Sequence, residues 1–165
     1  MTSRLMRAFA ATAVLVGLAA APAAAQTFTL TANLTGAGEA TQTTNGINTG
    51  AFGNAVIVVD MTARTVTYTV TVFNLPSGII ASHIHVGAVN TPGPVVVAFA
   101  VPATASNDFS FTGTTADTAF ILRPDQGIRS ADDMFQAILG GNSYVNVHSA
   151  VNPGGEIRGQ LVLKQ

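Results

Sequence analysis

The residues best suited to chemistry in this chain are its three histidines, His83, His85 and His148. His83 and His85 are two residues apart in a segment that reads as a strand, so both project from one face of it. Three neutral imidazoles that converge suit zinc or copper and leave a fourth position open for water or substrate. The same side chains can instead form a polar layer in which neighbouring groups satisfy each ring nitrogen. Both interpretations stay open at this point.

A cluster of further polar residues is expected beside the histidines: Tyr144, Asn146, Glu156 and Arg158. Alternation places Tyr144, Asn146 and His148 on one strand face, and Glu156 and Arg158 on one face of the next strand. The segment Asn152–Gly155 links the two strands with a Pro and a Gly where a type II turn needs them. Such a hairpin brings Glu156 and Arg158 near Asn146 and His148, where a structural charged pair is available.

Other catalytic chemistries find no support in the sequence. There is no cysteine to act as a nucleophile, and no nucleophile elbow, phosphate loop, dinucleotide fingerprint or EF-hand loop is present. Ser82 and Ser149 each adjoin a histidine, but neighbours on a strand face opposite ways, so no serine triad follows. No catalytic residue is expected, and the protein is predicted not to be an enzyme.

The N-terminus has the pattern of a cleavable secretory signal. Arg4 and Arg7 precede an apolar run from Ala8 to Ala21, and Ala23-Ala24-Ala25 comes before the polar Gln26. The run is about 14 residues, short of the roughly 20 that span a bilayer as a helix. We therefore expect residues 1–25 to be removed, a secreted or periplasmic protein, and no stable membrane insertion afterwards, with an uncleaved anchor as the alternative.

The mature chain, residues 26–165, has the length of one domain. It keeps five of the seven basic residues and all eight acidic ones, which gives a net charge of about −3 and argues against nucleic acid or anionic membrane surfaces as partners. Because cysteine is absent, no disulfide can brace this exported domain, and its core alone must hold it unless a metal helps.

Alternation of apolar and polar residues predicts an all-β fold with about eight strands and one short helix. The helix is expected over 131–139, with Ser130 as its cap and Gly140-Gly141 as its end. Regular turn signals favour a sandwich or Greek-key barrel. The strands are expected at 27–34, 54–59, 65–73, 79–86, 95–101, 109–112, 144–149 and 156–163.

Three separated segments resemble, in the family's order, the signature segments of the CHRD domain, the module named after chordin: His83–Gly87, Tyr144–His148 and Pro153–Leu161. The segment Leu34–Glu39 and the hairpin from Gly53 to Leu75 also resemble the first half of that domain. The match departs after Glu39, where Ala40-Thr41 replaces the usual Val-Pro. The resemblance implies an extracellular β-barrel of immunoglobulin or superoxide-dismutase type and says little about activity.

A more distant similarity to copper-zinc superoxide dismutase places His83, His85, His148 and Arg158 at comparable points of the chain order. That enzyme has a bridging histidine and a disulfide that this chain lacks, so dismutase activity is not expected. Three functions are considered. The first is a non-enzymatic extracellular binding module without a cofactor, for an unknown protein or glycan partner. The second is a mononuclear copper or zinc protein using the three histidines, and the third is a structural envelope or matrix protein.

Overall fold

The computed structural model describes residues 26–40, 45–103 and 105–165, so the expected signal segment lies outside the described part. Its strands form one antiparallel, nearly closed barrel-like sheet in the order β5-β4-β7-β8-β1-β2-β3-β6, with the short β9 paired to β1. The strand bounds are β1 Thr27–Thr35, β2 Phe52–Asp60, β3 Thr65–Leu75, β4 Ile79–Val86, β5 Val95–Ala98, β6 Asn107–Ala116, β7 Ser143–Ser149, β8 Ile157–Gln160 and β9 Val162–Leu163. The all-β Greek-key class predicted from the sequence is confirmed.

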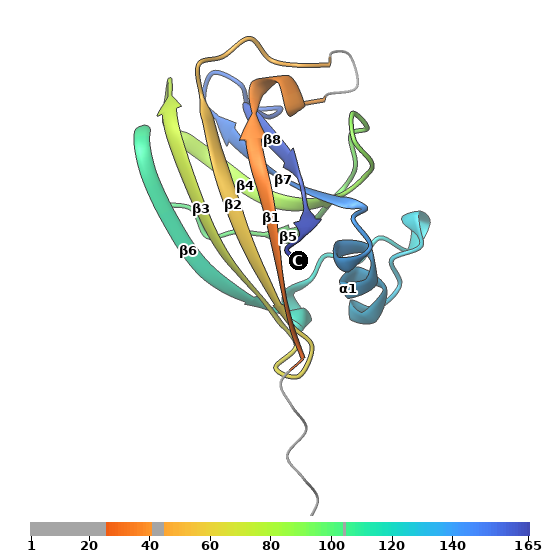
Figure 1. Ribbon diagram of the computed structural model, residues 1–165. Helices are drawn as coiled ribbons and strands as arrows, with labels where there is room; N and C mark the ends of the chain where they lie inside the picture. Colours follow the sequence, from red (N-terminus) through yellow and green to blue (C-terminus); the bar gives the residue numbers. More distant parts are fainter. Residues whose placement is uncertain (1–25, 41–44, 104) are drawn as a thin grey trace, which may run out of the picture.

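The two halves of the sheet face one another across the core. Figure 1 shows β1, β2, β3 and β6 side by side along one flank, with β4, β5, β7 and β8 behind them. The inward alternation that defined the strands in the sequence fills the space between them, with fully buried residues such as Leu30, Ile57 and Val70. No helix in the described ranges is long and apolar enough to cross a membrane.

Five details of the sequence prediction are wrong. The strand expected at 95–101 ends at Ala98, because β5 pairs with β4 only as far as that residue. The last strand, expected over 156–163, divides at the buried Leu161, because β8 lies between β7 and β1 while β9 pairs with β1 alone. The hairpin loop after β2 has four residues rather than five, since Asp60 pairs with Thr65. The strand expected at 109–112 runs over Asn107–Ala116 because β6 follows β3 along most of its length. The turn Asn152–Gly155 is not of type II, because the positive φ belongs to Gly155 and not to Gly154.

Within the described ranges there is one α-helix, α1, which spans Ala131–Leu139 as predicted. The Ser130 hydroxyl accepts the Asp133 N–H, and the Asp133 carboxylate accepts the Ser130 N–H, which completes a capping box. Met134, Phe135 and Ile138 point into the core from this helix. In Figure 1 it lies beside the sheet, towards the end at which β1 begins.

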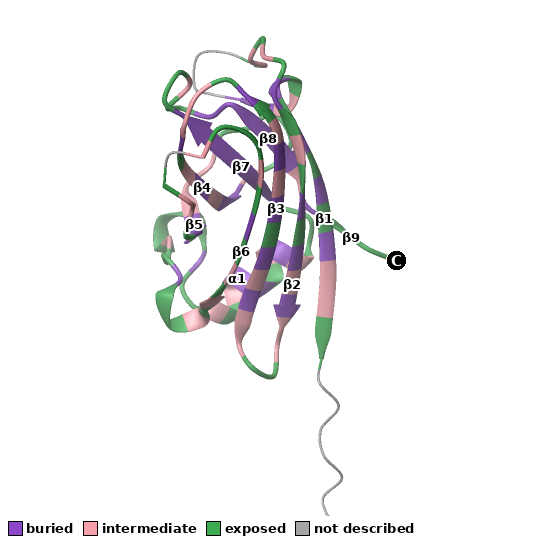
Figure 2. Cartoon of the chain, turned by 90° about the vertical axis from the view of Figure 1, so that its left-hand side faces the viewer, coloured by how far each residue is buried: buried purple, intermediate pink, exposed green. Residues whose placement is uncertain are grey.

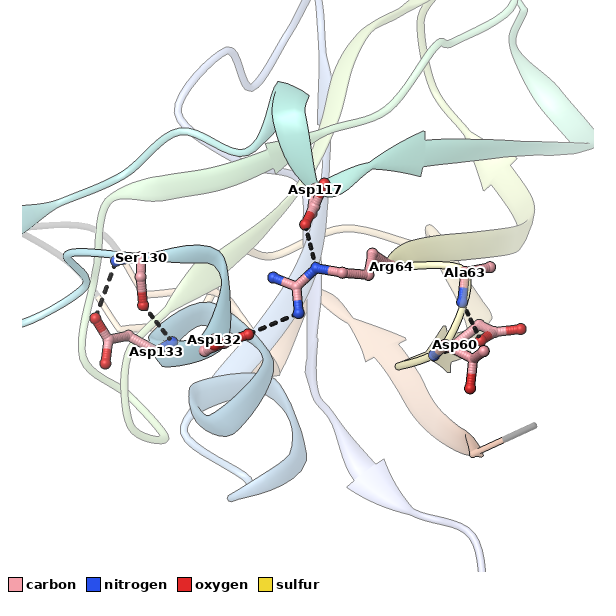
Figure 3. A network of polar contacts seen from close by, with 8 residues as sticks. Asp60, Ala63, Arg64, Asp117, Ser130, Asp132 and Asp133 are labelled. Atoms are coloured by element: carbon pink, nitrogen blue, oxygen red, sulfur yellow. Dashed lines mark hydrogen bonds and ion pairs between the residues drawn. The ribbon is translucent and has the colours of Figure 1, made fainter. Parts of the chain in front are cut away.

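Arg64, at the tip of the β2–β3 hairpin, ties that hairpin to α1. Its guanidinium donates to Asp117 and, at 2.7 Å, to Asp132 in the first turn of the helix (Figure 3). The same group lies 5.2 Å from the centre of the Phe135 ring. These contacts fix the helix against the barrel.

Strand β7 differs from the other strands because every one of its residues is buried, which Figure 2 shows as a continuously purple strand. Val145 and Val147 face the apolar core. Tyr144, Asn146 and His148 face the other way, into a second buried layer that is polar. That polar layer contains the candidate site.

Candidate metal site

The structure brings the three histidines together. His83 and His85 come from β4 and His148 from the neighbouring β7, and one nitrogen from each lies within 4.8 Å of the others. The closest approach joins His83 Nδ1 to His148 Nε2, at 3.2 Å. Two nitrogens bound to one tetrahedral ion at about 2.0–2.1 Å would lie about 3.3 Å apart. The pair therefore already has the separation of two ligands on one ion.

Backbone carbonyls orient two of the three rings. His85 Nδ1 donates to the carbonyl of Gly93 at 2.8 Å, and His148 Nδ1 donates to the carbonyl of Pro153 at 2.9 Å. A proton on Nδ1 leaves the lone pair on Nε2, which is the atom that faces the other histidines. His85 Nε2 is buried and has no hydrogen-bond partner of normal geometry. An unpaired buried nitrogen is costly unless a ligand completes it.

The environment keeps the imidazoles neutral. Burial, followed by the nearby His148 and His85, lowers the pKa of His83 to about 4. Burial also lowers the pKa of His85 to about 4, against the opposing effect of the Gly93 carbonyl, and it lowers the pKa of His148. Neutral imidazole is the form that binds a metal ion, so near pH 7 these rings are ready to act as ligands.

Tyr144 and Arg158 extend the site from β7 to β8. The rings of His85 and Tyr144 are stacked, with centroids 4.8 Å apart and planes inclined by 6°. The Arg158 guanidinium lies 3.3 Å from the centre of the Tyr144 ring. Since β7 lies between β4 and β8, the phenol ring separates the imidazole from the guanidinium.

The loop between β4 and β5, residues 87–94, covers this layer. Arg158 donates to the carbonyl of Ala88 at 2.7 Å, and Gln160 donates to the carbonyl of Gly87 at 2.9 Å. The N–H of Gly93 donates to the Tyr144 hydroxyl at 3.0 Å. These polar side chains can lie under the loop because they form hydrogen bonds with the backbone groups of the loop that covers them.

Glu39 belongs to the site, although the sequence interpretation gave it no role. It follows the 3-10 turn Gly36–Gly38 and is 2% exposed. One carboxylate oxygen accepts the Ala40 N–H at 3.0 Å, and the other is buried with no hydrogen-bond partner of normal geometry among the described residues. Burial raises its pKa to about 7, although hydrogen bonding to Ala40, the positive charge of Arg158 and hydrogen bonding to Asn146 oppose the shift. A glutamate in a Gly-rich loop was a weak signal, because loop carboxylates are usually solvated.

Glu156 lies outside the histidine cluster and does not pair with Arg158. Its carboxylate accepts from the Ser149 hydroxyl and from the Asn152 amide, each at 2.6 Å, and so secures the β7–β8 turn. Burial acts to raise the pKa of Glu156, but these hydrogen bonds outweigh it and hold the pKa below its ordinary value. Burial lowers the pKa of Arg158, and the groups whose charges oppose that shift are Tyr144 and Glu39, not Glu156. The charged pair expected between Glu156 and Arg158 is therefore corrected.

The family assignment agrees with this geometry. The profile of the CHRD domain matches residues 30–161, from β1 through the polar layer to the end of β8. Among curated proteins and among solved structures, none matches the chain significantly. The match covers most of the chain and includes all three histidines, Arg158 and Glu39, so this protein belongs to the CHRD domain family.

Proposed function

We propose that this protein is a non-enzymatic exported domain that binds one zinc or copper ion through His83, His85 and His148. The observation that carries the proposal is the convergence of three ring nitrogens, one from each histidine. In two of these rings, those of His85 and His148, Nδ1 is hydrogen-bonded to a backbone carbonyl. A hydrogen-bonded carbonyl on the far nitrogen is the usual companion of a histidine that binds metal.

The donor set decides which ions fit. Imidazole suits zinc and copper, and the absence of cysteine removes the thiolate ligands on which many intracellular sites depend. His83 is partly exposed while His85 and His148 are buried, so the ion would enter on the His83 side. Export from the cytoplasm and the absence of catalysis are parts of this proposal, supported by the N-terminal pattern and by the lack of any nucleophile motif in the sequence. A protein or glycan partner and an assembly role stay predictions from the sequence.

The test is elemental analysis of the protein purified from the exported fraction without chelator. We expect near-stoichiometric zinc or copper in the wild type and none in a His83→Ala, His85→Ala, His148→Ala variant. His83→Ala alone provides a check if the triple variant does not fold, because His83 is the most exposed of the three. Wild-type protein that is free of metal and also fails to bind added zinc or copper would contradict the proposal.

A further inference from the structure

Asn146 stands at the centre of the polar layer, opposite His83 in the β4–β7 register and opposite Arg158 in the β7–β8 register. It is 2% exposed. Its Oδ1 lies 3.1 Å from His148 Nε2, on the same nitrogen that approaches His83.

The contact between Asn146 and His148 joins two acceptors. Because His148 Nδ1 donates to Pro153, its Nε2 carries a lone pair, and the facing amide oxygen carries two. Two lone pairs at 3.1 Å repel one another unless a cation lies between them. A metal ion at this point would convert the repulsion into coordination.

The Asn146 amide oxygen, and not its nitrogen, faces His148 Nε2. Hydrogen bonding to Asn146 also acts to lower the pKa of Glu39, which fits an amide nitrogen turned towards that carboxyl group. Glu39 in turn packs against the backbone of Gly155, in the turn whose Pro153 carbonyl holds His148.

We propose that Asn146 Oδ1 is a fourth ligand of the metal ion. This inference rests on the proposed function. Three imidazole nitrogens and one amide oxygen complete a tetrahedral ligand set, so no coordination position on the ion is left open for a substrate. The open fourth position expected from the sequence is then filled. A closed site of this kind favours holding an ion over catalysis on it.

The experiment compares wild type with Asn146→Ala and Asn146→Asp, and with Asn33→Ala, which removes an exposed asparagine on β1, as the control. Zinc affinity is measured by competition with a chelating dye, and the coordination sphere is followed by the visible absorption of the Co²⁺-loaded proteins. Asn146→Ala should lower the zinc affinity about 100-fold and change the Co²⁺ bands, since an oxygen ligand is lost. Asn146→Asp should bind zinc at least tenfold more tightly than Asn146→Ala, because a carboxylate oxygen takes the same place. Asn33→Ala should behave as wild type.

Asn146→Ala with wild-type affinity and unchanged Co²⁺ bands would overturn the inference while leaving the three-histidine site intact. If Asn146→Ala does not fold, as judged by circular dichroism, Asn146→Asp decides alone. A charged ligand oxygen must alter the Co²⁺ bands, so bands and affinity identical to wild type would count against the fourth ligand. Wild-type protein that binds neither Zn²⁺ nor Co²⁺ would defeat the proposed function itself.

Discussion

Tyr144 contacts His85 directly and also through Gly93, in the loop between β4 and β5. The Tyr144 ring stacks on the imidazole at 4.8 Å, and its hydroxyl accepts the N–H of Gly93, the residue whose carbonyl accepts from His85 Nδ1. Tyr144 and Gly93 therefore constrain the ligand ring from its face and from its edge. Because the ring contacts His85 and the hydroxyl contacts Gly93, the effect of the hydroxyl can be tested without removing the ring.

Tyr144→Phe should weaken zinc binding about tenfold, because the ring stack survives while the anchor of the Gly93 carbonyl is lost. Its free energy of unfolding should fall by about 1 kcal/mol. Tyr68→Phe is the matched control, since the Tyr68 hydroxyl also accepts a backbone N–H, that of Ala100, at 2.8 Å. The control should lose similar stability and bind zinc normally. Equal zinc affinity in both variants would show that the hydroxyl has no part in the site.

Gly155→Ala should be far more harmful than Gly127→Ala. Both glycines have positive φ, 134° and 82°, so both substitutions strain the backbone by about 1–2 kcal/mol. At Gly127 an added Cβ meets open space, whereas at Gly155 it would overlap the Glu39 carboxylate. We expect Gly155→Ala to cost at least about 2 kcal/mol more in urea unfolding and to weaken zinc binding. Equal costs would mean that the turn does not rest on Glu39.

Glu39 should make the metal-free protein less stable as the pH rises. Its pKa is about 7 in the folded protein against 4.5 ordinarily, so the folded state binds more protons between these values and stability falls through this window, by about 3 kcal/mol. His83 and His85 act in the opposite sense, because their pKa values near 4 lie below 6.5 and their contribution grows from pH 4 to 6.5.

The comparison with Glu39→Gln isolates the glutamate from the histidines. The measured quantity is the unfolding free energy of Glu39→Gln minus that of the wild type, with both proteins in chelator. This difference should increase by about 3 kcal/mol between pH 5 and pH 8. Urea titrations at several pH values measure this difference. Parallel pH profiles for the two proteins would show that Glu39 titrates normally.

Arg64 offers a prediction about the fold rather than the site. Its φ is 58°, in the left-handed region that glycine adopts freely. Arg64→Ala and Arg64→Gly both remove the contacts with Asp117, Asp132 and Phe135, but only glycine relieves the backbone strain. Arg64→Gly should therefore unfold at a higher temperature than Arg64→Ala, with both below wild type in a calorimetric scan. The reverse order would show that the backbone at this position is not strained.

The elements themselves could be predicted from local patterns. Period-two alternation located the strands because one face of each borders the core, and the capping residues of α1 are adjacent in sequence. The boundaries that failed depend on partners distant in the chain. The strand after Glu156 divides at Leu161 because β8 pairs with both β7 and β1 whereas β9 pairs with β1 alone, and no local pattern records these partners.

Strand periodicity alone places His83 and His85 on one strand face and Tyr144, Asn146 and His148 on another, and it identifies the chain as all-β, because side-chain direction alternates along a strand. The packed fold was needed to show that these faces meet, that a loop buries them, and that Tyr144 and Glu39 rather than Glu156 act on Arg158. Those facts depend on strand order and on where loops return to the sheet, and both are set by packing between segments far apart in the chain.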